Sequence, residues 1–206
     1  MPLDLVDLFP KTIGVAQLQT LTPEVIEKAK ELIDIGVDYH MEHDGGFTRE
    51  QQLLNKAIFR EVKQEILQLC REYAEAHSHI VEDIAICNSW GNVVNYGDSI
   101  RPHSHTNSYI SGSFYLTEGT PFNVINDDAN TLFGFMPAKR PDNNFRAMES
   151  FNIDPKPGRL ILFPSNLRHL VLPSRSHERR YSIAFNAVPV GRIGSVTNML
   201  HIRVED

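Results

Sequence analysis

The sequence predicts an α+β fold that is mostly β: a double-stranded β-helix of the jelly-roll, cupin-like kind, with N-terminal helices packed on one side. Three observations lead to this prediction. Apolar residues recur at helical spacing within the first 80 residues, the period becomes that of strands from about residue 84, and clusters of Gly, Pro, Asn and Asp break those strands at short intervals. Helices first and many short strands afterwards place the helices against one side of a sandwich or barrel.

Two amphipathic helices are predicted in the N-terminal part. The first begins after Thr22, which can cap it, places Pro23 at its first position, and continues at helical spacing until Gly36. The second runs from about Phe59 to the residue before His77, with apolar side chains every three or four residues along one stripe. Because each helix has an apolar face to bury, we expect both to pack on the sheet.

The remainder of the chain is predicted to form short strands. The candidates are residues 84–89, 92–96, 109–117, 122–126, 131–135, 159–163, 167–172 and 181–188. We expect residues 1–206 to form one domain, in which residues 1–80 provide a helical support and residues 81–206 form the β-helix core.

The alternation within two of these strands predicts a polar surface that faces a ligand. In the last strand one face carries Arg180 and Ser182, a guanidinium beside a hydroxyl that suits a carboxylate, and the opposite face is apolar. In residues 109–117 the polar face includes Tyr115, which we expect to point into the mouth of the barrel beside Arg180. A tyrosine in a strand is more often part of the core, so this expectation rests on the register of Tyr115.

Composition excludes several classes of protein. The net charge of −6 provides no basic face for a nucleic-acid backbone. Cys70 and Cys87 lie far apart and imply no disulfide framework. The N-terminus has acidic residues where a signal peptide needs cationic ones, and no apolar stretch is long enough to span a membrane. We therefore expect an intracellular, cytoplasmic protein.

Three histidines form a candidate metal site. His103 and His105 are two residues apart, so in an extended strand both imidazoles point to one face. His169, at the predicted start of a later strand, is the candidate third ligand. The pair His77 and His79 has the same spacing at the end of a helix, where an imidazole is favourable beside the terminal carbonyls, and we expect it to be structural.

The order of these parts resembles that of the 2-oxoglutarate- and iron(II)-dependent oxygenases. That family carries His-x-Asp/Glu at a strand end, a distal His, and an Arg on the following strand; here those places are held by His103-Ser104-His105, His169 and Arg180. The phrases SGSFYL, GRLILFPSNLRH and RRYSIAFN, with LFP near the N-terminus, are similar to a group of uncharacterised oxygenases from marine bacteria and their phages. The resemblance covers most of the chain and extends the expected location to a phage-infected bacterial host.

The resemblance implies two cofactors, Fe(II) and 2-oxoglutarate, with dioxygen as co-substrate. The implied iron ligands and catalytic residues are His103, His105 and His169. The residues implied to hold 2-oxoglutarate are Arg180, Ser182 and Tyr115, with Tyr96 alongside. The implied activity is hydroxylation of a small molecule or peptide, with release of succinate and CO2.

The chain departs from the family's pattern at position 105, where His105 replaces the usual carboxylate. Three neutral imidazoles would still leave open positions on the metal, but the site would be one unit more positive, which favours the anionic 2-oxoglutarate. We expect His105 to coordinate. Two alternatives stay open: His105 points away and water or an anion completes the site, or Asp98 or Asp127 supplies the carboxylate through space.

Two other classes of function compete with the oxygenase. The first is a cupin-type three-histidine metalloenzyme that does not use 2-oxoglutarate. Gly97 and His103-x-His105 fit the opening of the first cupin motif, but the glutamate expected shortly afterwards is missing, and Gly158 is too far from His169 for the second motif. The second is a non-catalytic β-helix that binds a ligand or partner, which the loss of the acidic ligand at position 105 would favour.

No motif identifies the substrate or the oligomeric state. Residues 138–150, with Arg140 and Arg146, are expected to form a loop at the mouth that favours an anionic or peptide substrate. His40 and His43 precede two glycines and are expected in a solvated loop rather than a metal site.

Overall fold

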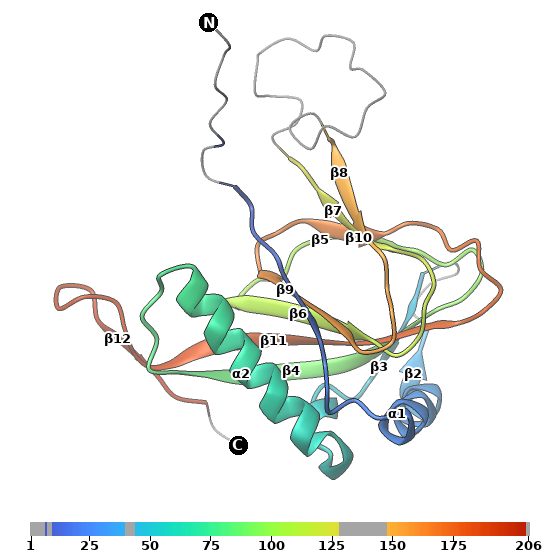
Figure 1. Cartoon of the computed structure of the whole chain (residues 1–206), viewed down its shortest axis with the longest axis horizontal. Coiled ribbons are helices and arrows are strands. Elements are labelled where there is room, and N and C mark those ends of the chain that lie inside the picture. Colours follow the sequence, from blue (N-terminus) through green and yellow to red (C-terminus); the bar gives the residue numbers. More distant parts are fainter. Residues whose placement is uncertain (1–6, 8–9, 40–43, 128–147, 205–206) are drawn as a thin grey trace, which may run out of the picture.

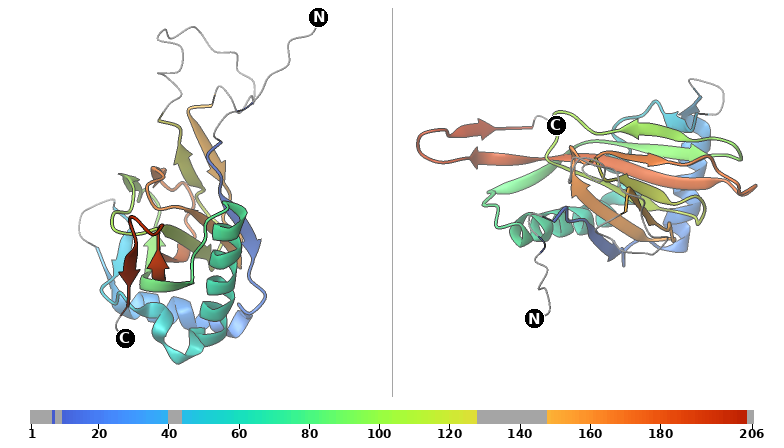
Figure 2. Two further views of the ribbon diagram at one scale, coloured as in Figure 1. Left: turned by 90° about the vertical axis from the view of Figure 1, so that its left-hand side faces the viewer. Right: turned by 90° about the horizontal axis from the view of Figure 1, so that it is seen from above.

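The computed structural model describes residues 7, 10–39, 44–127 and 148–204. Within these residues the strands form two antiparallel sheets, and two α-helices lie on the outer side of the larger sheet (Figures 1 and 2). The mostly β, α+β architecture predicted from the sequence is therefore confirmed, with the helices on one side.

The secondary-structure elements follow one another in the order β, α, then mainly β. The helical segments are α1 (Pro23–Gly36), η1 (Leu53–Asn55), η2 (Ala57–Phe59) and α2 (Arg60–Ala76). The strands are β1 (Gly14–Gln17), β2 (Val37–Asp38), β3 (Gly46–Thr48), β4 (Asp83–Val94), β5 (Ile100–His103), β6 (Ile110–Tyr115), β7 (Phe122–Ile125), β8 (Ser150–Ile153), β9 (Arg159–Pro164), β10 (His169–Val171), β11 (Arg180–Ile193) and β12 (Leu200–Ile202).

The larger sheet has the order β1-β9-β6-β11-β4-β3-β2, and β12 pairs with the far end of β11. The smaller sheet has the order β5-β10-β7-β8. Its edge strand β5 contains Pro102, which cannot donate to a ladder and is therefore tolerated at an edge. The absence of alternation around Pro102 also explains why the sequence did not predict β5.

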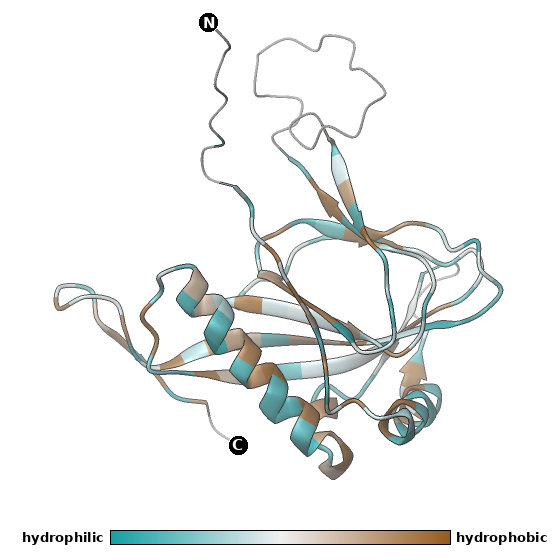
Figure 3. Ribbon diagram, viewed as in Figure 1, coloured by the Kyte–Doolittle hydropathy of each residue, from teal (hydrophilic) through white to brown (hydrophobic). Residues whose placement is uncertain are grey.

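The main hydrophobic core lies between the two helices and the larger sheet. Thr22 accepts a hydrogen bond from Val25 N–H and Pro23 occupies the first turn of α1, as predicted. Figure 3 shows a hydrophobic and a hydrophilic side on α2. The buried members of this core from the helices and β11 include Ala29, Ile33, Val62, Ile66, Cys70, Ala74, Tyr181, Ile183 and Phe185. The apolar face predicted for residues 181–185 is thus the face under the helices.

A second, smaller core lies between the two sheets. It brings together Phe122 from β7, Ile153 from β8 and Phe163 from β9, with Tyr115 from β6 and Leu167. The polar face of β11, opposite the face that packs under the helices, borders a pocket beside this second core.

The strand predictions differ from the structure in several places, and β8 and β12 were not predicted. Residues 84–89 and 92–96 were predicted as separate strands, but β4 is continuous through Gly91. A side chain at this position would overlap Ile33, so the glycine allows α1 to pack closely on the strand. The predicted strand at residues 131–135 lies outside the described residues. The first 80 residues also contribute β1, β2 and β3 to the larger sheet, although only helices were predicted there. These strands are too short for a period of two to be recognised.

The two cysteines carry free thiols, as expected. Cys70 is fully buried on α2, and burial raises the pKa of its thiol to about 12. No helix within the described ranges combines the length and apolar character that crossing a membrane requires.

Candidate metal centre

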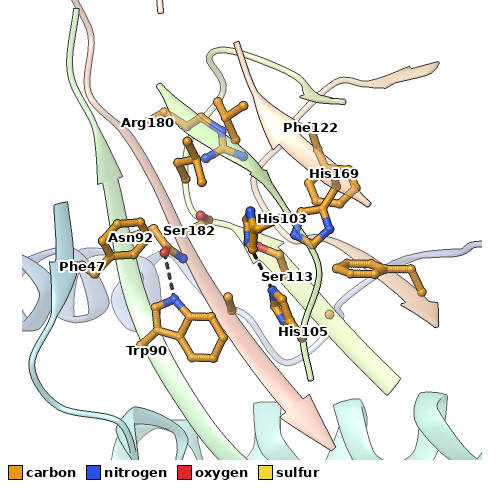
Figure 4. Close-up of a pocket in the computed structure, with 15 residues that line it drawn as sticks. Phe47, Trp90, Asn92, His103, His105, Ser113, Phe122, His169, Arg180 and Ser182 are labelled. Carbon is orange, nitrogen blue, oxygen red and sulfur yellow. Dashed lines mark hydrogen bonds between the residues drawn. The ribbon is translucent and has the colours of Figure 1, made fainter. Parts of the chain in front are cut away.

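Three histidines converge between the sheets (Figure 4). His103 ends β5 and His169 begins β10, and the two residues are directly paired across these antiparallel strands. His105 follows two residues after His103, and the Nε2 atoms of these two rings are 3.4 Å apart. One potential ligand atom from each of the three rings lies within 4.8 Å of those of the other two, which is close enough for one ion.

The position of His105 has a different origin from the one predicted. Strand β5 ends at His103, so His105 does not lie on an extended strand with it. Instead, the backbone N–H of His105 donates to Ser165 O at 2.8 Å, which anchors the residue after the strand end. The ring is held by Asn186 of β11, whose Oδ1 contacts its Nδ1.

Hydrogen bonds fix the tautomer of all three imidazoles. Nδ1 of His103 donates to Arg101 O at 2.8 Å, and Nδ1 of His169 donates to Leu167 O at 2.9 Å. Nδ1 of His105 contacts Asn186 Oδ1, which also accepts from the Ser111 hydroxyl at 2.7 Å. Because a carbonyl oxygen only accepts, each Nδ1 bears the proton, and each Nε2 keeps its lone pair for a metal.

Burial keeps two of the rings neutral. Desolvation lowers the pKa of His169 to about 3, and the hydrogen bond to Leu167 O opposes this shift only in part. Desolvation also lowers the pKa of His105, against the opposing effect of Asn186. The ring of Phe122 stacks on His169 with centroids 4.9 Å apart. Neutral imidazoles are the form that binds metal, so neither ring has to lose a proton first at neutral pH.

A buried guanidinium and a hydroxyl lie at another end of the same pocket. Arg180, the first residue of β11, is 2% exposed, and both it and Ser182 line the pocket with the histidines. The guanidinium carbon of Arg180 lies 4.9 Å from the ring centroid of Tyr115, which is itself paired with Ser182 in the register of β6 and β11. Arg180, Ser182 and Tyr115 therefore lie close together. Tyr115 was expected to point into the mouth of the barrel, but it is fully buried and is not among the residues that line the pocket.

Two polar atoms at this end lack a protein partner. Within the described part of the chain, no group hydrogen-bonds to Arg180 Nε or to the Tyr115 hydroxyl, and both atoms are buried. Burial lowers the pKa of Arg180 and raises that of Tyr115, while each group opposes the shift of the other. A buried cation with an unpaired donor is costly unless an anion meets it.

The pocket between the histidines and Arg180 has a volume of about 60 Å³. Its described lining includes no Asp or Glu, so nothing there offsets the charge of Arg180. A divalent metal on three neutral imidazoles would add two further positive charges. The donor set therefore fits a metal, and the charge of the pocket fits a small dianion beside it.

The alternative carboxylates predicted for the site are engaged elsewhere. Asp98 accepts hydrogen bonds from the backbone N–H and the side chain of Asn95. Asp127 forms an ion pair with Arg168 at 2.7 Å. Among the described residues, neither belongs to the group of side chains that could share an ion with His103.

Tyr96 does not lie beside the pocket, which corrects the role suggested for it. The turn formed by Asn95, Gly97 and Asp98 carries Tyr96 outward, where it is 58% exposed and stacks on His177. The histidines His40 and His43 and the arginines Arg140 and Arg146 lie outside the described residues, so the structure does not place them.

Three supporting polar residues were not identified from the sequence. Asn186, Ser111 and Ser165 form a hydrogen-bonded chain beside His105, in which Ser111 donates to Asn186 Oδ1 and the hydroxyl oxygens of Ser111 and Ser165 lie 2.9 Å apart. Alternation placed Asn186 on the polar face, but an Asn or Ser in a strand carries no signal that it supports a metal ligand. Their partners come from separate strands and become visible only in the fold.

Comparisons with known proteins agree with this geometry. The profile of the family described as "Putative 2OG-Fe(II) oxygenase" matches residues 88–186, a segment that contains His103, His105, His169 and Arg180. Residues 88–186 are therefore similar to the 2-oxoglutarate- and iron(II)-dependent oxygenases. The cofactors of this family are Fe(II) and 2-oxoglutarate. A comparison with curated proteins gives no match.

Several solved structures share the fold of this chain. HygX from Streptomyces hygroscopicus, with nickel, 2-oxoglutarate and hygromycin B bound, has 11% sequence identity and a TM-score of 0.60, over 87% of this chain and 83% of HygX. A prolyl-4-hydroxylase from Pseudomonas putida has 12% identity and a TM-score of 0.58, over 85% and 92%. The 2-oxoglutarate-dependent epimerase SnoN from nogalamycin biosynthesis has 9% identity and a TM-score of 0.63, over 88% and 80%. The predicted jelly-roll fold is confirmed.

Proposed function

We propose that this oxygenase hydroxylates a small organic substrate. The overall reaction converts substrate R–H, dioxygen and 2-oxoglutarate into R–OH, succinate and CO2. One oxygen atom of dioxygen enters R–OH and the other enters succinate. In such a site, bound Fe(II) and 2-oxoglutarate together supply the activation of dioxygen. We also propose that residues 1–206 act as one domain, with residues 1–80 supporting the β-helix core of residues 81–206.

The single observation that carries the proposal is the buried guanidinium of Arg180, whose Nε has no hydrogen-bond partner among the described residues. A buried cation in a pocket whose described lining contains no Asp or Glu is costly unless an anion meets it, and the planar fork of Arg suits a carboxylate. The three-histidine metal site in the same pocket explains why this ligand is best a 2-oxo acid: one end can chelate a metal while the other end meets Arg180.

We assign separate roles to the residues of the pocket. His103, His105 and His169 hold the metal through Nε2, and the acceptors on their Nδ1 atoms keep the rings oriented. Arg180 and Ser182 hold the far carboxylate of 2-oxoglutarate, and the Tyr115 hydroxyl, also buried and without a protein partner, supports them. Trp90 and Phe163 near His105 exclude water from the metal.

The three-histidine donor set favours one competing function, a cupin-type metalloenzyme that does not use 2-oxoglutarate. The two functions differ in their need for Arg180. A three-histidine enzyme without a 2-oxo acid has no ligand for this cation, so the buried guanidinium argues for the oxygenase.

The decisive experiment is an anaerobic titration of the metal-free protein with Fe(II) and then 2-oxoglutarate. We expect a visible metal-to-ligand charge-transfer band, which reports chelation of the 2-oxo acid without knowledge of the substrate. Succinate, which lacks the keto group, serves as the control and should give no band. Binding of Fe(II) without a band would favour the competing metalloenzyme, and failure to bind Fe(II), Mn(II) or Co(II) would leave a non-catalytic binding module.

A further inference from the structure

Asn92 is a buried polar residue of the metal pocket that has no role in the function proposed above. It lies on β4, is 5% exposed, and lines the pocket between the histidines and Arg180. Its Oδ1 accepts a hydrogen bond from the indole N–H of Trp90 at 3.0 Å. Within the described residues, its Nδ2 donates to no protein group. Buried N–H groups are costly without a partner, so Nδ2 is left for a ligand.

The hydrogen bond from Trp90 fixes the orientation of the Asn92 amide. An indole nitrogen can only donate, so the amide atom that faces it must be the oxygen. Nδ2 is then directed away from Trp90, and Figure 4 shows it on the side where Ser182 and His103 lie. Asn92 therefore presents donors to the pocket, and the molecule that they meet must supply acceptor oxygens.

The register of the larger sheet places Asn92 between Arg180 and the histidines. Ser182 is the direct partner of Asn92 in the ladder between β11 and β4, so the two side chains share one face. Arg180 lies two residues before Ser182 on β11. Asn186, which holds the ring of His105, lies four residues after it. A ligand that reaches from Arg180 to a metal on the histidines must therefore pass Asn92.

Trp90 also belongs to the wall of a second, open cleft of about 430 Å³ that adjoins the metal pocket. The two share four lining residues: Phe47, Trp90, Ile100 and His103. Asn92 lines only the metal pocket, although Phe47 is its partner in the ladder between β3 and β4. The same amide thus faces the pocket with its nitrogen and holds a wall of the cleft with its oxygen.

We propose that Asn92 binds the 2-oxo acid and couples it to the adjoining cleft. Beside Ser182, its N–H groups donate to the far carboxylate of 2-oxoglutarate, while its oxygen holds Trp90. The bound carboxylate fixes the amide and the amide fixes the indole, so cofactor binding makes this wall of the cleft more rigid. The inference rests on the function proposed above and adds a binding residue that links the two parts of the site.

Two substitutions at this position test the donors. Asn92→Leu removes them without adding charge and should weaken 2-oxoglutarate about tenfold in the anaerobic charge-transfer titration. Asn92→Asp keeps an oxygen for Trp90 but sets a negative charge against the carboxylate, and should weaken it about 100-fold. The matched control is Asn88→Asp, which adds the same charge to β4 outside the pocket lining and should stay within about threefold of the wild type.

A shorter 2-oxo acid separates binding from a structural effect. 2-Oxobutyrate keeps the keto acid end but lacks the far carboxylate, so it has nothing for Asn92 to hold. Its dissociation constant in Asn92→Leu should stay within about twofold of the wild-type value, while that of 2-oxoglutarate rises about tenfold. A general distortion of the pocket would weaken both acids.

The sole tryptophan of the chain reports the coupling directly. Protein loaded with Zn(II), which does not support turnover, should give one indole N–H signal in ¹⁵N NMR. We expect 2-oxoglutarate to slow the exchange of this proton with water about fivefold in the wild type and to leave it unchanged in Asn92→Leu, where the acceptor is missing. 2-Oxobutyrate should have no such effect on the wild type.

The outcomes separate this inference from the proposed function. If Asn92→Leu binds 2-oxoglutarate as the wild type does, or if it weakens both acids equally, Asn92 does not hold the carboxylate and the inference is wrong. If 2-oxoglutarate does not change indole exchange in the wild type, the coupling to the cleft is wrong. In each of these cases the proposed function stands, and it fails only if the wild type does not bind 2-oxoglutarate.

Discussion

Two His-Ser-His segments occur in this chain, and among the described residues only one of them lies in a group of side chains that could hold a metal ion. His77 and His79 follow the end of α2, with ring centroids 6.0 Å apart, whereas those of His103 and His105 lie 5.3 Å apart. In both segments each Nδ1 has a hydrogen-bond partner: Tyr73 O and the Tyr109 hydroxyl in the first, Arg101 O and Asn186 in the second.

The difference lies in what the fold brings to each pair. His103 faces His169 across two paired strands, and β11 supplies Asn186, so a third ligand and a support arrive from distant parts of the chain. The rings of His77 and His79 lie beside those of Tyr73 and Tyr109, and within the described residues no other potential ligand completes a group of three with them. The His-x-His spacing alone therefore does not identify a metal site, and the presence of a third ligand distinguishes the two pairs.

The largest expected effect is the loss of that third ligand. His169→Ala should lower the affinity for Co(II) by about 1,000-fold, or about 4 kcal/mol, because one of three ligands is lost. His79→Ala removes a histidine of the other pair and should leave the affinity within about twofold. Anaerobic isothermal titration calorimetry measures both. Equal affinity of His169→Ala and wild type would contradict the three-histidine centre.

The second test concerns the charge that the metal centre has and the other pair lacks. Arg180→Met should weaken 2-oxoglutarate binding about 100-fold, or about 2.8 kcal/mol, because the carboxylate loses a buried bidentate partner. Its neighbour Arg179 is half-exposed and pairs with Asp34, so Arg179→Met is the matched control and should bind normally. The charge-transfer titration provides both dissociation constants. An unchanged constant for Arg180→Met would remove the oxygenase assignment of this pocket.

The third test uses pH. The pKa of His169 is lowered to about 3 in the folded protein, so between pH 6.5 and pH 3 the unfolded chain binds a proton there that the folded protein does not. The metal-free protein should therefore lose stability as the pH falls through this window, by up to about 1.4 kcal/mol per pH unit. Urea unfolding at pH 7, 6 and 5 measures the slope, which should be smaller in His169→Gln. An equal slope in the two proteins would show that burial does not hold His169 neutral.

The smallest expected effect comes from the support of His105. Asn186→Ala removes the acceptor on its Nδ1 and should lower Co(II) affinity about tenfold, since the ring loses its orientation. Tyr109→Phe removes the corresponding partner of His79 and should not change Co(II) affinity. If both variants bind Co(II) like the wild type, the hydrogen bond to Asn186 does not orient a ligand.

Local sequence signals predicted the parts of this fold that depend on local physics. Thr22 and Pro23 mark the start of α1 because capping involves neighbouring residues, and alternation separated Arg180 and Ser182 from the apolar face of β11. The strand predictions failed where contacts between distant parts of the chain determine the structure. Residues 84–89 and 92–96 were predicted as separate strands, but β4 continues through Gly91, where any side chain would overlap Ile33 of α1.

The same distinction applies to the site. The three histidines could be selected by type and order, but the support of His105 by Asn186 and Ser165 depends on contacts between separate segments. The turn that directs Tyr96 into solvent is closed by hydrogen bonds from Asn95 to Asp98, which depend on the local backbone conformation. Side-chain direction in loops was thus the least predictable feature.

Because His103 and His169 are paired directly, a metal bound to both would cross-link two strands in addition to its role in catalysis. These residues are 66 positions apart in the sequence, and an ion bound to both ties a long loop whose closure otherwise costs conformational entropy. This cross-link would hold β5, a short edge strand, to β10. In contrast, β11 is already paired with β4 along most of its length and with β6 over residues 182–187. Metal loading should therefore slow amide hydrogen exchange in β5 and β10 far more than in β11, because a bound ion would add a link between the two strands of the smaller sheet.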